Sequence, residues 1–102
     1  MGYSVRFTQY ARNDLARLYD WLLQRAESGF TVVERALQAI RDGVIVLALA
    51  PLSCRKAVPA DPFLRELVIG FGASGYVLLF EVESNQVVTV LAVRHQREDD
   101  YH

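Results

Sequence analysis

The sequence is poor in several residue types and patterns, and each shortage excludes a class of protein. A single cysteine, Cys54, cannot form an internal disulfide, so we expect a reducing compartment. The first residues show no secretory pattern, and the longest apolar run, Val44 to Pro51, is too short to span a bilayer. Only two histidines are present, and P-loop, GxGxxG, CxxC, HExxH and GxSxG motifs are missing. We therefore expect a cytoplasmic protein with no membrane anchor, no metal and no cofactor.

The sequence also lacks an excess of charge of either sign. The chain has 11 Lys and Arg against 12 Asp and Glu, a net charge of −1, and Lys56 is its only lysine. Proteins that bind nucleic acid usually carry an excess of Lys and Arg, because their affinity comes from contacts that neutralise phosphates. Apolar residues make up 52% of the 102 positions, which is enough for one core. We expect a single domain over residues 1–102.

Hydrophobic periodicity predicts a strand followed by two helices. Residues 3–7 alternate between apolar and polar side chains, as in a half-buried strand. Thr8 is a suitable N-cap for a first helix, and Gly29 marks its end. A second helix is expected from Thr31 to Pro51. The polar side chains of the first helix are expected to face solvent; they are Arg12, Asp14, Arg17, Asp20 and Gln24. Asp14 and Arg17, three residues apart, are expected to form an ion pair on this surface.

The second half of the chain predicts a loop and three strands. Three prolines indicate a loop over residues 51–62, and strands are expected over 63–69, 76–83 and 87–95, with a glycine-rich hairpin turn between the first two. The order is therefore βααβββ. We predict an α+β fold: a small antiparallel (mixed) sheet, in which the first strand pairs in parallel with a later one, and a two-helix hairpin packed on one face.

The end of the last expected strand carries the side chains best suited to chemistry. His95 titrates near neutral pH, Arg97 is suited to phosphate or carboxylate, and Tyr101 can stack on a base or donate a proton. The alternative is an ordinary polar strand end, in which acidic neighbours neutralise Arg94 and Arg97. Trp21, next to the apolar stripe of the first helix, is either partly buried or part of a contact surface.

Three segments of the chain together resemble the RelE/ParE superfamily of type II toxins. They are Phe63 to Leu67, Gly75 to Val82, and Val90 to Tyr101 with its VRHQRE..Y ending. The resemblance implies the same small sheet with a helix hairpin. It also implies one of two activities, because RelE-like members cut mRNA in the ribosomal A site, whereas ParE-like members poison DNA gyrase.

Residue by residue, the chain departs from the RelE-like nuclease pattern. The catalytic arginine that follows the Gly-Tyr pair in those nucleases falls on Val77, and Arg65 is the only cation between residues 63 and 69. The second nuclease arginine aligns near Gln96, and the tyrosine matches Tyr101 only approximately. Residues 51–102 carry 5 Lys and Arg against 7 Asp and Glu, which is a poor surface for stabilising charge on phosphate. The resemblance therefore favours the ParE-like branch and disfavours an enzyme.

This interpretation yields expected partners and contact residues. The expected partners are DNA gyrase and a cognate antitoxin that forms a hetero-oligomer with the chain. The expected target-binding residues are Arg65, Arg94, His95, Arg97 and Tyr101, and the expected antitoxin-binding residues are Leu15, Tyr19, Trp21 and Leu22. Two alternatives stay open. One is a ribosome-dependent mRNA endoribonuclease using Arg65, His95, Arg97 and Tyr101, and the other is a non-toxic, degenerate binding module.

Overall fold

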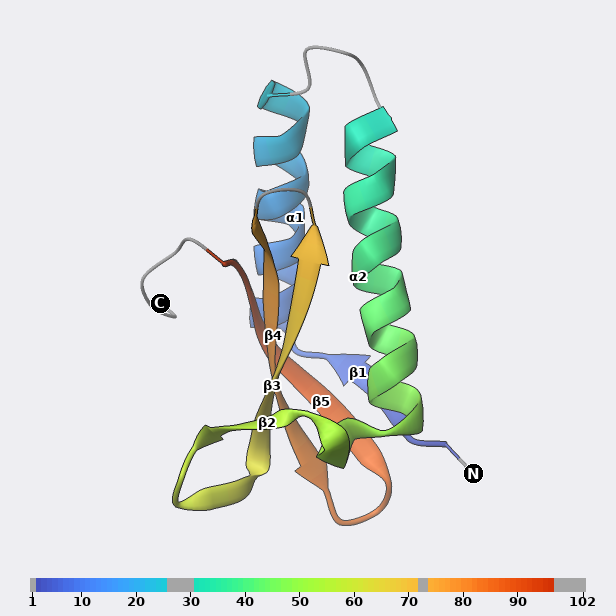
Figure 1. Cartoon of the computed structure of the whole chain (residues 1–102), viewed down its shortest axis with the longest axis vertical. Coiled ribbons are helices and arrows are strands. Elements are labelled where there is room, and N and C mark those ends of the chain that lie inside the picture. The colour runs from blue at the N-terminus through green and yellow to red at the C-terminus, as the bar shows by residue number, and fades with distance from the viewer. Residues whose placement is uncertain (1, 26–30, 72–73, 97–102) are drawn as a thin grey trace.

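Two helices lie on one side of a five-stranded mixed sheet in the computed structural model, which describes residues 2–25, 31–71 and 74–96 (Figure 1). The strand order is β1-β5-β4-β3-β2, in which β1 pairs with β5 in parallel and every other pair is antiparallel. This confirms the predicted α+β fold. The elements are β1 Ser4–Phe7, α1 Gln9–Arg25, α2 Thr31–Leu49, a 3₁₀ turn Pro51–Ser53, β2 Arg55–Val58, β3 Asp61–Phe71, β4 Ser74–Glu83 and β5 Val87–His95.

The core forms between the sheet and both helices. On β4, alternate side chains from Tyr76 to Val82 face the helices and are buried, as the period of two predicts. The helices contribute side chains at intervals of three and four residues, which places them on one stripe of each helix. These buried helical residues are Ala11, Leu18 and Leu22 of α1 and Val33, Ala36, Ile40 and Leu47 of α2.

Thr8 joins β1 to α1 and confirms the predicted N-cap. Its hydroxyl oxygen accepts the backbone N–H of Ala11 at 3.1 Å, which satisfies one of the free donors at the start of the helix. The same hydroxyl donates to the carbonyl of Leu91 in β5 at 3.3 Å. One side chain thus caps α1 and fixes that helix to the sheet.

The predicted loop over residues 51–62 is wrong in its middle, because Arg55–Val58 forms β2 and β3 begins at Asp61 rather than Phe63. None of the three prolines lies inside β2, and Pro62 is the second residue of β3 and is not a partner in the pairing between the two strands. Proline is compatible with such a position because its missing N–H is not needed there. The predicted end of the first helix at Gly29 lies outside the described residues.

β5 contains one extra residue, Leu91, relative to its neighbour β4. Leu79 pairs with Ala92, whereas Phe80 pairs with Val90, so that Leu91 has no partner on β4. This is a β-bulge, which adds twist and changes the side to which the following residues point. Beyond the bulge, Arg94 lies opposite Val77 and His95 lies opposite Tyr76.

Candidate functional site

The predicted target-binding residues at the end of β5 lie on opposite sides of the sheet. The His95 ring lies on the helix side, between the rings of Trp21 and Tyr76, with centroid distances of 5.6 Å and 5.8 Å. Phe71 extends this aromatic cluster, 6.2 Å from Tyr76. Burial raises the pKa of the Tyr76 hydroxyl, which therefore stays protonated at neutral pH. The cluster is a packed set of rings that includes the predicted histidine.

Arg94 points to the other side of the sheet, which we call the open face because neither helix covers it. Its described charged residues are three arginines and three glutamates: Arg6, Arg55, Arg94, Glu66, Glu81 and Glu83. Two of the arginines form ion pairs, Arg6 Nη2 with Glu83 Oε2 and Arg55 Nε with Glu66 Oε1, each at 3.1 Å. Positive charge on this face is therefore balanced within the described residues.

Two side chains hold the carboxylate of Glu83 on the open face. The Thr89 hydroxyl donates a hydrogen bond to it, and the Arg6 guanidinium lies beside it. These contacts, with the Thr89 bond as the larger cause, lower the pKa of Glu83. Glu83 is therefore ionised at neutral pH and is not poised to act as a general acid.

Arg65, the third predicted target residue, is held by backbone carbonyls instead. Its Nε donates to the Pro62 carbonyl at 2.7 Å, and its Nη1 donates to the carbonyls of Cys54 at 2.8 Å and Leu52 at 3.3 Å. It lies opposite Phe80, four residues along β4 from Tyr76, so it is roughly 13 Å from the aromatic cluster along the strands. The structure therefore does not bring Arg65 and His95 together. Arg97 and Tyr101 lie outside the described residues.

The four predicted antitoxin contacts on α1 separate into different surroundings. Leu22 is 7% exposed and belongs to the core, so its side chain is not available to a partner. Leu15 lines an apolar groove of about 550 Å³ between α1 and α2, with Leu37, Val44 and Ile45 of α2. Trp21 is 39% exposed and lines a different hollow, next to Arg17 and Asp20.

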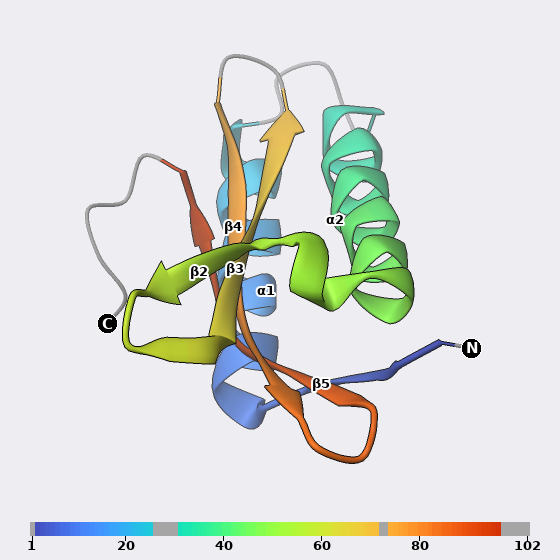
Figure 2. The same ribbon diagram turned by 60° about the horizontal axis from the view of Figure 1, so that its bottom comes forward.

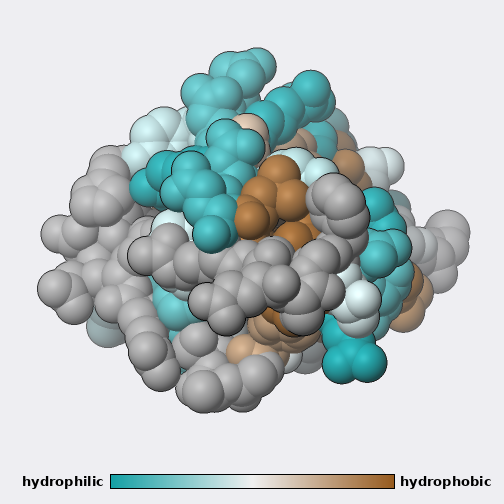
Figure 3. Space-filling view, turned by 90° about the horizontal axis from the view of Figure 1, so that it is seen from above, coloured by the Kyte–Doolittle hydropathy of each residue, from teal (hydrophilic) through white to brown (hydrophobic). Residues whose placement is uncertain are grey.

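Apolar surface also reaches the end of the molecule where α1 finishes and α2 starts. Seen from that end, hydrophobic surface is visible between groups of hydrophilic side chains (Figure 3). Besides Trp21, two large apolar side chains are exposed in the second half of α1 and at the start of α2. They are Tyr19 of α1, 38% exposed, and Val32 of α2, 40% exposed. The helix pair thus offers apolar surface to a partner at more than one place.

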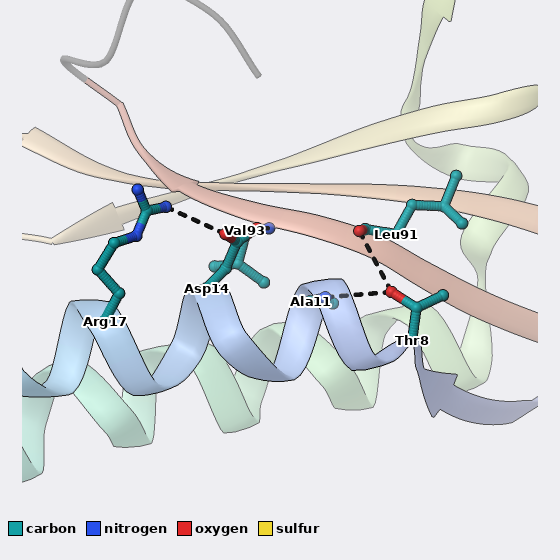
Figure 4. Close-up of polar contacts among 6 residues, drawn as sticks. All are labelled: Thr8, Ala11, Asp14, Arg17, Leu91 and Val93. Atoms are coloured by element: carbon teal, nitrogen blue, oxygen red, sulfur yellow. Dashed lines mark hydrogen bonds and ion pairs between the residues drawn. The ribbon is translucent and has the colours of Figure 1, made fainter. Parts of the chain in front are cut away.

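Asp14, which is expected on the solvent side, is instead buried against the sheet. Asp14 is 8% exposed, and its Oδ2 accepts the buried backbone N–H of Val93 at 2.9 Å (Figure 4). Its Oδ1 accepts from Arg17 Nη2 at 3.1 Å, so the predicted ion pair is present. A signal was available, because Asp14 lies three residues after Ala11 and four before Leu18, within the stripe that faces the sheet.

The described residues provide little for metal or thiol chemistry. In residues 2–25, 31–71 and 74–96, no three His, Cys, Asp or Glu side chains are grouped as a metal ion requires. Cys54 is buried, and this burial raises the pKa of its thiol, which leaves little thiolate at neutral pH. Neither described helix is long and apolar enough to cross a membrane.

Comparison with known proteins gives concordant results. Residues 5–100 match the model of the family described as the ParE toxin of the type II toxin-antitoxin system parDE. The chain is 38% identical over 96 residues to Toxin RelE3 of Caulobacter vibrioides, an alignment that covers 93% of this chain and 96% of that protein.

Two solved structures share the fold. One belongs to the chromosomal ParDE toxin-antitoxin system of P. aeruginosa, with a TM-score of 0.70, 20% identity, and coverage of 91% of this chain and 95% of that chain. The other belongs to the toxin-antitoxin complex RelBE2 of Mycobacterium tuberculosis, with a TM-score of 0.53, 23% identity, and coverage of 96% and 95%.

Proposed function

Because the chain belongs to the ParE toxin family of type II toxin-antitoxin systems, we propose that it inhibits DNA gyrase by protein–protein contact and is neutralised by a co-encoded antitoxin. It acts in this proposal as an inhibitor, with no chemical step of its own. The residues that contact gyrase are sought on the open face, around Arg94, because Arg65 is bound to backbone carbonyls and His95 is packed against Trp21.

The charge balance of the open face is the observation that carries this proposal. A protein that cleaves RNA by stabilising charge on phosphate needs unbalanced cations where that charge develops. Here Glu83 and Glu66 pair with Arg6 and Arg55, and the charge of Glu81 equals that of the third arginine of the face, Arg94, with opposite sign. Val77 occupies the position of the RelE-like catalytic arginine and is 1% exposed. The face therefore suits contact with a protein better than contact with an RNA backbone.

A ribosome-dependent endoribonuclease is the second candidate, and one observation favours it. Arg94 lies directly opposite Val77 on the neighbouring strand, so a cation is present beside the position at which the RelE-like arginine is missing. The relative from Caulobacter vibrioides also carries a RelE name. In this alternative, Arg94 is the first residue to substitute.

The proposed antitoxin contact lies on the helix side. The groove between α1 and α2 is lined by apolar side chains, among them Leu15, Leu37 and Ile45, and Ile45 is 56% exposed. An amphipathic helix or extended segment that covers this groove buries apolar surface, which favours association. Tyr19 and Trp21 remain proposed antitoxin contacts, on separate sides of α1.

The deciding experiment compares two targets with the same preparation of protein. DNA supercoiling by gyrase is measured with the purified chain and with its Arg94→Ala variant, each with and without antitoxin. We expect the wild type to block supercoiling, the antitoxin to restore it, and Arg94→Ala to inhibit less at equal concentration. Toe-printing on translating ribosomes is expected to show no codon-position cuts.

The opposite results identify the alternatives. Normal supercoiling together with ribosomal cuts that disappear in Arg94→Ala assigns the chain to the endoribonuclease. Normal supercoiling, no cuts and unaffected growth when the chain is expressed without antitoxin identify a non-toxic binding module.

A further inference from the structure

One stretch of the sheet edge is left unpaired by the rest of the described chain. β2 pairs with β3 only as far as Glu66, although β3 continues to Phe71. Beyond Glu66, β3 extends past β2 and lies beside α2 (Figure 1, Figure 2). We call residues 67–71 of β3 the free edge.

The hydrogen bonds of β4 show which way the backbone N–H and carbonyl groups of the free edge point. The carbonyl of Gly75 accepts the N–H of Gln96 at 2.7 Å, so this carbonyl points toward β5 and away from β3. Gly70, the β3 partner of Gly75, therefore directs its N–H and carbonyl away from β4. Because the direction alternates along a strand, Val68 points its backbone groups the same way. Two consecutive outward positions are thus available for a further strand.

The other sheet edges are protected. β1 and β2 have four residues each, β1 carries Arg6, and β2 carries Arg55 and Lys56, which are features that discourage strand addition. Where β5 extends past β1, two side chains take the place of a strand: the hydroxyl of Thr8, the N-cap of α1, donates to the Leu91 carbonyl, and the carboxylate of Asp14 in α1 accepts the Val93 N–H.

The free edge has none of these protections. Its sequence, Leu-Val-Ile-Gly-Phe, contains no charge and no proline, Val68 is 38% exposed, and a Cβ added at Gly70 would meet no described heavy atom within 4 Å. A hydrophobic edge of this kind is expected to bind another strand.

A groove beside the free edge indicates the chemistry of the strand it accepts. The groove has a volume of about 290 Å³, and apolar side chains that include Val46, Leu67 and Ile69 line it. Asp42 of α2 is its one charged lining residue among the described residues. A second copy of this chain would bring two Asp42 carboxylates to the same interface, whereas a strand with apolar residues at alternate positions and a Lys or Arg beside Asp42 matches both the walls and the charge.

We infer that the free edge of β3 binds an extended segment of the antitoxin, which adds a strand to the sheet beside β3, inserts apolar side chains between β3 and α2, and places a basic side chain at Asp42. This inference rests on the proposed function for the existence of the antitoxin partner. It is independent of the groove between α1 and α2, which lies on the opposite side of α2.

Amide hydrogen exchange tests the backbone part of the inference in the unmodified protein. Exchange is measured residue by residue in the free chain and in its complex with the co-encoded antitoxin. We expect the amides of Val68 and Gly70 to be slowed at least tenfold by the antitoxin, and those of Leu67 and Ile69, which face β4, to change less. Unchanged exchange at Val68 and Gly70 in a stable complex overturns the inference and leaves the proposed function intact.

A pair of substitutions at one position tests the same contact by affinity. Gly70→Pro removes an outward N–H and places a ring where the added strand would lie, at an edge position that tolerates proline. Gly70→Ala adds a methyl group into open space. We expect Gly70→Pro to weaken the antitoxin Kd at least tenfold and Gly70→Ala to change it less than twofold, with thermal unfolding confirming that both variants are folded. Asp42→Lys is expected to weaken binding several-fold.

The other outcomes are informative as well. Equal affinity of wild type and folded Gly70→Pro contradicts strand addition at this edge. Dimerisation of the antitoxin-free chain that Gly70→Pro abolishes, seen by sedimentation, assigns the edge to a second copy instead. If the wild type forms no complex with the antitoxin, then the proposed neutralisation and this inference both fail.

Discussion

Asp14 and Val93, 79 positions apart in the sequence, are joined by a buried hydrogen bond in which the Asp14 Oδ2 accepts the backbone N–H of Val93 at 2.9 Å. β1 pairs with β5 only as far as Val90, so no strand accepts the N–H of Val93 on that side. The Asp14 carboxylate supplies the hydrogen-bond acceptor that a neighbouring strand would otherwise provide. It also connects α1 to the part of β5 that leads to Arg94 and His95. A polar side chain on a helix thereby helps to position the end of the sheet.

The first prediction concerns this bond. Asp14→Ala is expected to lower the free energy of unfolding by about 1–3 kcal/mol, because it leaves a buried N–H without an acceptor. Asp14→Asn keeps an acceptor oxygen and is expected to cost less. Arg17→Ala removes only the half-exposed partner of Asp14 and is expected to cost at most about 1 kcal/mol. Urea denaturation measures all three variants, and equal losses for Asp14→Ala and Arg17→Ala would show that the ion pair, rather than the bond to Val93, is the important contact.

The second prediction compares two glycines that are partners across β3 and β4. A Cβ at Gly75 would lie 1.9 Å from the backbone oxygen of Ile69, so Gly75→Ala requires the backbone to move. A Cβ at Gly70 would have no heavy atom within 4 Å among the neighbours that the structure describes. We expect Gly75→Ala to lower the free energy of unfolding by about 1–3 kcal/mol and Gly70→Ala to change it by less than about 0.5 kcal/mol. Thermal or chemical unfolding of the two variants side by side checks this, and comparable stabilities would contradict the close approach at Gly75.

The third prediction separates a structural role of Arg65 from a role in target contact. Arg65→Ala leaves three backbone carbonyls without their guanidinium donor, so we expect a loss of about 1–3 kcal/mol in the free energy of unfolding. Arg55→Ala removes an ion pair whose arginine is largely exposed, and is the matched control with an expected cost below about 1 kcal/mol.

Gyrase inhibition by Arg65→Ala is measured at a temperature where the variant is fully folded. We expect it to equal inhibition by the wild type. A folded Arg65→Ala variant that no longer inhibits would return Arg65 to the target contact.

The fourth prediction concerns pH. The hydrogen bond from Thr89, with the contact to Arg6, lowers the pKa of Glu83 in the folded chain. A carboxyl group with a lowered folded-state pKa stabilises the fold above its unfolded-state pKa, and this contribution is lost as the pH falls below about 4. NMR titration of the Glu83 carboxyl carbon is expected to show a higher midpoint in Thr89→Val than in the wild type, and a smaller rise in Arg6→Ala. An unchanged midpoint in Thr89→Val would contradict the assigned cause.

The local pattern of the sequence was sufficient for most of the fold. Apolar residues spaced three and four apart predicted both helices, and Thr8 predicted the first cap. Alternation predicted the strand of residues 76–83, and a nearly all-apolar run predicted that of residues 87–95. β2 was missed because a four-residue strand at a sheet edge, with two of its residues charged, has no hydrophobic pattern of its own. Its position depends on pairing with β3, which is information from outside the segment.

The candidate site was less predictable, because it depends on contacts between distant segments. A charged residue such as Asp14 is normally exposed, and only the three-dimensional position of the Val93 N–H explains why it is buried. Arginine commonly binds phosphate, but the guanidinium of Arg65 already donates to three backbone carbonyls. These belong to the turn before β2, to Cys54 and to the start of β3, so the sequence around Arg65 does not reveal them. The aromatic contact between Trp21 and His95 joins residues 74 positions apart and has no local signal.

The extra residue at Leu91 decides which side chains of β5 face each partner. In a regular strand, inward and outward positions alternate without interruption, so counting from the buried Val88 and Val90 would place Arg94 against the helices and His95 on the exposed side. The insertion reverses this order for every later residue. Regular pairing with Leu91 retained would therefore exchange the two surfaces, burying a guanidinium beside Trp21 and moving the imidazole to the side proposed to meet gyrase. Deletion of Leu91 would instead remove the bulge and leave Arg94 opposite Val77 and His95 opposite Tyr76, so the open face would keep its side chains.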